Sequence, residues 1–198
     1  MVVVLDTCVY LRLAKRIRPF LGKEFGQKNY VLKVLQVVEK EVKRNSTLSF
    51  KNPWFDENEF FVERDSHSMR MSPQEKIDMS LIRSIFNGYI LEHLNEFMIG
   101  GRSPPGSADC EVLAFASIRN AIVVTDDIGL HQLAIAFKIP VWHGYELLSK
   151  LFAAKVVDSN LIREIFDALE RNKDLTQTWE EAKYSKFKKV FGNKKEAL

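Results

Sequence analysis

The sequence has few cysteines and no long apolar run, and each shortage excludes a class of protein. Only Cys8 and Cys110 are present among 198 residues, too few to hold the chain together by disulfides, so we expect a reducing, cytoplasmic setting. No apolar stretch approaches the roughly 18 residues that a membrane span needs. The apolar run at residues 2–5 meets Asp6 at once, so we expect no secretory signal. Contact with a membrane is therefore not expected.

Neither sign of charge is in large excess, because 26 Asp and Glu side chains oppose 29 Lys and Arg side chains. The formal net charge of +3 is too small to indicate nucleic-acid binding by itself. A charged fraction of 28% with 46% hydrophobic residues excludes a disordered chain and is typical of a globular one. At this length we expect one domain with an appendage.

The spacing of aspartates and histidines disfavours two kinds of site, a phosphatase site and a histidine-ligated metal site. A phosphatase of the haloacid dehalogenase type needs a second aspartate two residues after the first, and Cys8 stands there after Asp6. No metal-ligand spacing relates the four histidines, which are His67, His93, His131 and His143. We therefore expect the histidines to be structural or exposed.

Strands and helices alternate along the first three quarters of the sequence. Short β-branched or apolar runs at residues 2–5, 121–124 and 139–142 predict buried strands. Helical spacing of apolar residues predicts a helix over about 30–44, and residues 47–50 predict another short strand. The alternation indicates an α/β protein, a three-layer α/β/α domain with a mostly parallel central sheet.

Two helical segments stand outside this alternation. We predict a domain over residues 1–150 that contains a helical insertion at about 66–101, followed by a helical C-terminal extension over 151–198. A capping-box pattern at residues 72–75 predicts the start of the helix in the insertion.

Apolar side chains of the insertion allow two interpretations. Ile90, Leu94 and Phe97 either pack in the core, which we prefer, or form an interface with a partner protein or a second copy.

Carboxylates follow the predicted strands. Asp6 ends the first strand, Asp126 and Asp127 end the strand at 121–124, and Asp109 lies in the first turn of the helix before it. Alone, each is explained as a cap or turn residue, but the carboxyl ends of parallel strands share one edge of a sheet. Two carboxylates roughly 4 Å apart repel by about 4 kcal/mol at an effective dielectric of 20. Because no Lys or Arg lies within these motifs, we expect Mg²⁺ or Mn²⁺, which prefer oxygen ligands, to bind them.

Four segments together resemble the PIN-domain nucleases. They are Val3–Cys8, Ser107–Ala116, Val123–Leu130 and Ile139–Trp142, each similar to one family motif and in the family's order. The resemblance implies a sheet of about five parallel strands and three or four acids that hold one or two Mg²⁺ or Mn²⁺ ions. It further implies hydrolysis of RNA phosphodiester bonds, and in many members a VapC-type toxin that is neutralised by an antitoxin.

The resemblance assigns the first, third and fourth acids. Asp6 is the first, Asp109 the third, and Asp127 the fourth because it lies two residues after Thr125. Asp126 is its neighbour and a further metal-ligand candidate. Thr7 and Thr125 are candidates for holding an acid or a phosphate through their hydroxyl groups.

The sequence does not decide which glutamate is the second acid. The family places a glutamate at the start of the helix after the second strand, and Glu59 is the preferred candidate, followed by Glu57. Glu39 and Glu41 are the next candidates. With Glu59, the expected catalytic acids are Asp6, Glu59, Asp109 and Asp127.

Basic residues after the first strand are candidates for binding RNA. Arg12, Lys15, Arg16 and Arg18 leave the strand end at which the acids gather. The alternative to a ribonuclease is a non-catalytic PIN scaffold that binds RNA or a partner protein, and loss of the second acid would favour it. An antitoxin and a second copy of the chain are the expected protein partners.

Overall fold

The central sheet of the computed structural model, which describes residues 1–193, has five strands in the order β2-β3-β1-β4-β5. The strands are β1 (Val2–Leu5), β2 (Glu24–Phe25), β3 (Tyr30–Val34), β4 (Ile122–Val124) and β5 (Val141–Trp142). β1 pairs parallel with β3 and β4, β4 pairs parallel with β5, and only β2 runs antiparallel to its neighbour. The predicted α/β class with a mostly parallel five-stranded sheet is confirmed.

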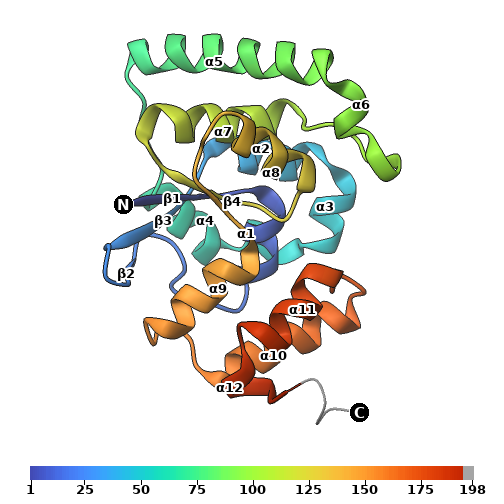
Figure 1. Ribbon diagram of the computed structural model, residues 1–198. Helices are drawn as coiled ribbons and strands as arrows, with labels where there is room; N and C mark the ends of the chain where they lie inside the picture. Colours follow the sequence, from blue (N-terminus) through green and yellow to red (C-terminus); the bar gives the residue numbers. More distant parts are fainter. Residues whose placement is uncertain (194–198) are drawn as a thin grey trace.

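Helices cover both faces of this sheet. The helices are α1 (Thr7–Leu13), α2 (Gln36–Arg44), α3 (Ser46–Lys51), α4 (Asn58–Ser66), α5 (Pro73–Glu92), α6 (Leu94–Phe97), α7 (Ser107–Arg119), α8 (Ile128–Ala136), α9 (Gly144–Ala153), α10 (Ser159–Arg171), α11 (Gln177–Ser185) and α12 (Lys188–Phe191), with the 3₁₀ turns η1 (Pro53–Asp56) and η2 (Ile99–Gly101). Val3 and Leu5 pack in a core with α1, α9, α10 and α11, whereas Val4 packs on the other side with α5, α7 and α8. In Figure 1, α5 and α7 accordingly lie above the sheet and α9 to α12 below it. This is the three-layer arrangement.

Two local predictions are wrong, and both concern the segment after β2. Residues 30–34 form strand β3 instead of the first turns of a helix, because Val31 pairs with Val2 and the run extends the sheet. Helix α2 begins only at Gln36. Residues 47–50 are helical within α3, whose start is capped by the Asn45 side chain accepting a hydrogen bond from the Leu48 N–H at 3.1 Å.

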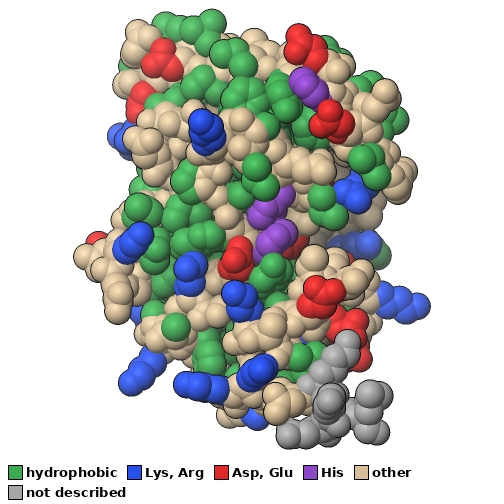
Figure 2. Space-filling view, viewed as in Figure 1, with side chains coloured by type: hydrophobic (Ala, Val, Ile, Leu, Met, Phe, Trp, Pro, Cys, Tyr) green, Lys and Arg blue, Asp and Glu red, His purple; other side chains and the backbone are tan. Residues whose placement is uncertain are grey.

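The insertion is anchored through one face of α5. The predicted capping box is present, with Ser72 accepting from the Glu75 N–H and Glu75 accepting from the Ser72 N–H. Ile90 and Phe97 are buried in the core below, so core packing is confirmed for these two. The outward face of α5 is exposed, and apolar side chains lie over this end of the molecule in Figure 2.

The C-terminal helices pack against the same core as β1. Phe166, Trp179 and Phe187 are fully buried there, together with residues of α1 and α9. Residues 194–198 of the predicted extension lie outside the described part of the chain. Among residues 1–193, no helix is both long enough and apolar enough to cross a membrane.

Candidate functional site

Two neighbouring strands bring the first acid to its site. Asp6 follows β1, and its N–H donates to the Val124 carbonyl oxygen at the end of β4 at 3.0 Å. This pairing sets Thr125 beside it, whose Oγ1 donates to Asp6 Oδ2 at 2.7 Å. Cys8 Sγ donates to the same oxygen at 2.9 Å. Burial raises the pKa of Asp6, and the negative charge of Glu41 adds to that effect, against the hydrogen bonds of Cys8 and Thr125.

Asp109 reaches the same place from the start of α7. Its Oδ2 accepts a hydrogen bond from the Gly106 N–H at 2.7 Å, which fixes the first turn of the helix. The pKa of Asp109 is raised from 3.8 to about 7, first by burial and then by the negative charge of Asp6. The charges of Glu41 and Asp127 add to this effect. The Gly106 N–H opposes them. Asp109 therefore lies within the electrostatic influence of three other acids.

Glu41 occupies the position that sequence reasoning gave to Glu59. It lies on α2, the helix that follows β3, and its Oε2 accepts a hydrogen bond from Thr7 Oγ1 at 2.5 Å. Thr7 comes directly after Asp6, so this bond ties α2 to the end of β1. We refer to Asp6, Glu41, Asp109 and Asp127 as the acidic cluster.

Each acid of the cluster has one carboxylate oxygen held by the protein. The held oxygens are Oδ2 of Asp6, Oε2 of Glu41, Oδ2 of Asp109 and Oδ1 of Asp127, the last accepting from the Leu130 N–H at 2.7 Å. For Glu41, Asp109 and Asp127, the second oxygen accepts no hydrogen bond in the described part of the chain, whereas Asp6 also accepts a backbone hydrogen bond from Thr7. The cluster thus offers four hard oxygen donors, which suit Mg²⁺ or Mn²⁺.

These donors do not form a finished metal site. Within residues 1–193, no three His, Cys, Asp or Glu side chains converge so that they could hold an ion together. The donor chemistry therefore fits a hard divalent cation, whereas the described side chains do not converge on one point.

The structure does not bring Glu59 to the other acids, which corrects the expected set. Glu59 is 65% exposed and forms an ion pair with Arg18 at 2.6 Å. Glu57 is also exposed, at the position before α4. Glu39 lies on α2 but pairs with Lys43 at 2.7 Å. Among the four glutamate candidates, only Glu41 contacts the residues around Asp6.

Asp126 is separated from the cluster by its contacts. Its Oδ2 accepts from an Arg12 N–H and from Trp179 Nε1, the latter at 2.9 Å, and its Oδ1 accepts from the Gly144 N–H at 2.9 Å. We refer to Asp126, Arg12, Trp179 and Gly144 as the Asp126 network. A Cβ on Gly144 would lie 2.9 Å from both Asp126 Oδ2 and Trp179 Cζ2, so the approach requires glycine. Both Asp126 oxygens are engaged by the protein, so this geometry does not support its expected role as a metal ligand.

Charges around Asp126 explain its ionisation. Burial acts to raise its pKa, but His143, Arg12, the Gly144 N–H and the Trp179 N–H together outweigh burial and lower it. His143 Nδ1 is 3.8 Å from Asp126 Oδ1, and the His143 ring stacks on His131. The carboxylate is thus held charged by the protein alone.

Most of the basic residues after β1 contact other side chains of the protein. Arg12 pairs with Asp126, and Arg18 pairs with Glu59 and lies 3.6 Å above the Phe60 ring. Partial burial, with the nearby charge of Arg171, lowers the pKa of Arg16. Lys15 is exposed. Of the four candidates for RNA binding, Lys15 is therefore the one most open to a ligand.

Sequence patterns rank one residue of the site too low and miss another. Glu41 ranks behind Glu59 in the sequence because residues 47–50 predict a strand, which places the expected acid on the helix after it. Trp179 lies more than 50 residues from Asp126, and no local pattern indicates their contact.

No protein-family model and no curated protein matches the chain. Three solved structures are similar to it: FitAcB from Neisseria gonorrhoeae, VapBC-1 from nontypeable Haemophilus influenzae, and VapBC2 from Rickettsia felis bound to a DNA fragment from their promoter. Their identities are 14%, 14% and 15%, with TM-scores of 0.46, 0.42 and 0.42. The matches span 72%, 73% and 72% of this chain and 98% of each of the other chains. Because the identities and the TM-scores are this low, a function is inferred only from the site and the sequence motifs.

Proposed function

We propose that this chain is a metal-dependent endoribonuclease of the PIN type, with Mg²⁺ or Mn²⁺ as its cofactor. The observation that carries the proposal is the acidic cluster, in which burial and the charges of the three other carboxylates raise the pKa of Asp109 to about 7. Carboxylates left uncompensated in a folded protein need protons or cations, and oxygen donors favour Mg²⁺ or Mn²⁺ over zinc. The PIN-like motifs of the sequence agree with this proposal.

Asp6, Glu41, Asp109 and Asp127 would hold the cation through their second carboxylate oxygens. In nucleases of this class, a bound divalent cation lowers the pKa of a water and offsets charge on the phosphate. The contribution of this chain is to fix the carboxylates. Thr125 and Cys8 orient Asp6, Thr7 orients Glu41, and the first turns of α7 and α8 orient Asp109 and Asp127.

Cleavage of a labelled single-stranded RNA tests the proposal. Activity should appear with Mn²⁺, disappear with EDTA, and fall at least about 100-fold in Asp6→Asn, Glu41→Gln and Asp109→Asn, since each removes a charged donor. Glu59→Gln is the matched control and should keep wild-type activity. Cleavage that survives Asp6→Asn and Asp109→Asn would overturn the proposal.

The second candidate function is a non-catalytic scaffold that binds RNA or a protein. It is favoured by one observation, that no three potential ligands among residues 1–193 converge to hold an ion. Calorimetric titration with Mn²⁺ separates the two functions. A ribonuclease should show heat that Asp109→Asn removes, whereas a scaffold should show no acid-dependent binding.

A protein partner is proposed on the sequence resemblance alone. If the chain is a toxin in a cytoplasmic toxin–antitoxin pair, an antitoxin should bind it and suppress cleavage. Co-expression with the product of a small neighbouring gene tests this, and a neighbour that neither binds nor inhibits would argue against it.

A further inference from the structure

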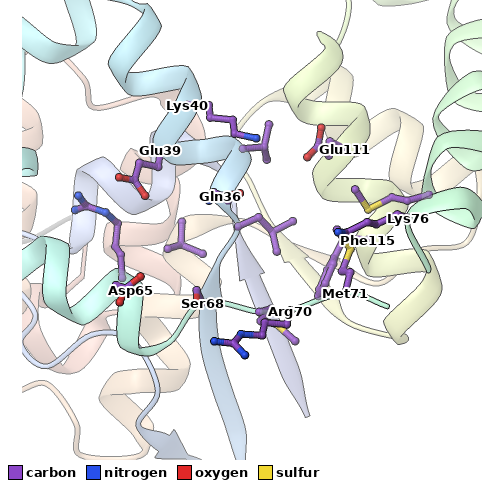
Figure 3. A pocket seen from close by; sticks show the side chains of 16 residues that line it. Gln36, Glu39, Lys40, Asp65, Ser68, Arg70, Met71, Lys76, Glu111 and Phe115 are labelled. Carbon is purple, nitrogen blue, oxygen red and sulfur yellow. The ribbon is translucent and has the colours of Figure 1, made fainter. Parts of the chain in front are cut away.

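A hollow of about 660 Å³ lies between α2, the segment before α5, and α7. Figure 3 shows Lys40 on α2, Arg70 and Met71 on the segment, and Lys76 at the start of α5 around this space. Arg70 and Lys76 belong to the helical insertion. The insertion therefore forms one wall of a cavity whose opposite wall is α2, the helix that carries Glu41.

A second hollow of about 640 Å³ adjoins the first. The two share Val37, Lys40 and Glu111 in their walls. The second hollow is also lined by Glu41 of the acidic cluster and by Ala108, the residue before Asp109. Together the hollows lead from the insertion to Glu41, one acid of the cluster.

The free charge of these walls is positive. Lys40, Arg70 and Lys76 of the first hollow and Arg44 of the second are exposed, and their side chains make no ion pair within residues 1–193. Such side chains, spaced along a groove, are suited to the phosphates of a nucleic-acid strand.

Of the four acids in the same walls, two are paired within the protein, whereas Asp65 and Glu41 of the acidic cluster make no ion pair among residues 1–193. Glu39 pairs with Lys43 and Glu111 pairs with Arg83 at 3.3 Å. Only Asp65 of the first hollow has no ion pair in the described residues. The walls therefore favour a polyanion.

Arg64 adds a second, independent observation. It lines the first hollow, is 3% exposed, and has two nitrogens, Nε and Nη2, that are buried without a hydrogen-bond partner. Its guanidinium lies 3.7 Å above the Phe55 ring, and only Nη1 reaches a partner, the Tyr10 hydroxyl at 3.5 Å. A buried cation without an anion nearby destabilises the folded state, so an anionic ligand bound in the hollow would supply the missing partner.

We propose that the two hollows form one track for single-stranded RNA, with its phosphates on Lys40, Arg70 and Lys76 and its scissile bond at the acidic cluster. The proposal rests on the proposed function and names the path of its substrate. It also gives the insertion a role, since the insertion supplies two of the three cations.

Binding of a fluorescein-labelled 12-nucleotide single-stranded RNA, followed by anisotropy in EDTA to prevent cleavage, tests the track. The triple variant Lys40→Ala/Arg70→Ala/Lys76→Ala should bind about tenfold more weakly. The slope of the logarithm of its binding constant against the logarithm of the salt concentration should decrease in magnitude by about 2, because each single-strand phosphate contact contributes about 0.7. The charge-matched control Lys23→Ala/Lys28→Ala/Lys188→Ala removes three exposed lysines that line neither hollow and should change neither value.

Two outcomes would overturn the track. One is equal loss of binding in both triple variants; the other is adenosine monophosphate displacing the RNA at the concentration at which an unlabelled 12-mer does, which would indicate a small-anion pocket. Failure of the proposed function is distinguishable, because it appears as absent Mn²⁺-dependent cleavage in the wild type whatever the binding result.

Arg64→Met separates binding from folding. Replacing an uncompensated buried cation by an apolar side chain of similar length should leave the melting temperature unchanged or raise it. The same variant should weaken RNA binding severalfold. A variant that binds RNA as the wild type does would remove Arg64 from the track, and with it the buried contact on which the proposal relies.

Discussion

Asp126 and Asp127 are neighbours in the chain but belong to opposite electrostatic environments. The Asp126 network surrounds one carboxylate with Arg12, two N–H donors and a nearby histidine, and the pKa of Asp126 is lowered. In the acidic cluster, burial and mutual repulsion raise the pKa of Asp109 to about 7. The comparison shows that acid content alone does not identify a functional site, since the protein compensates the Asp126 carboxylate and gives the acidic cluster no ion pair among residues 1–193.

Breaking the Asp126 network should have the largest effect on stability. Asp126→Ala leaves the Arg12 charge and the Trp179 N–H buried without their acceptor, so the free energy of unfolding should fall by about 3–5 kcal/mol. Urea denaturation measures it. Asp127→Ala, the matched change one residue on, removes only the cap of α8 and should cost about 1 kcal/mol. Equal losses in the two variants would contradict the distinction.

Removing a repelled acid should instead stabilise the metal-free protein. The Asp109 carboxyl titrates near 3.8 when unfolded and about 7 when folded, so the folded chain holds the extra proton between these values. Stability should therefore fall as the pH rises from about 4 to about 7. Asp109→Asn should remove the part of that decline that is due to Asp109, while the part due to the raised pKa of Asp6 stays. It should also raise the free energy of unfolding at pH 8, by at most about 4 kcal/mol from the change in the pKa of Asp109. Denaturation in EDTA at several pH values measures it, and an unchanged pH profile would contradict the assigned repulsion.

The contact from the C-terminal helices to the Asp126 network should have a smaller effect. Trp179→Phe keeps the buried ring and removes the hydrogen bond to the Asp126 carboxylate, which should cost about 2 kcal/mol. Trp142→Phe is the control, because no Trp142 side-chain hydrogen bond is found among residues 1–193. If thermal denaturation shows the same loss in both variants, ring size accounts for the effect and the hydrogen bond does not.

The sequence predicted the sheet and three of the four clustered acids because each follows from local pattern. Asp6 and Asp127 end β-branched runs, and Asp109 opens an amphipathic helix. Glu41 was misplaced because Val31 and Val34 satisfy helical and strand spacing alike, and pairing with β1 decides between them. Its identification needed the order of strands, which is a tertiary property.

The role of Asp126 was also beyond local pattern. Its partners Arg12, Gly144 and Trp179 come from three distant segments, and the sequence indicates only that an acid follows β4. The strand end predicted where the carboxylate lies, while packing of α11 determined what it contacts.

Calorimetric titration of the EDTA-treated protein with Mn²⁺ tests the central claim that the acidic cluster is the cation site. Wild type, Asp126→Asn and Glu59→Gln are compared with Glu41→Gln, each at pH 8, at which Asp109 is mostly charged. We predict that Glu41→Gln weakens Mn²⁺ binding at least about tenfold, since it removes one charged oxygen donor, while Glu59→Gln and any folded Asp126→Asn bind as the wild type does. Mn²⁺ affinity that depends on Glu59 or Asp126 and not on Glu41 would contradict the account.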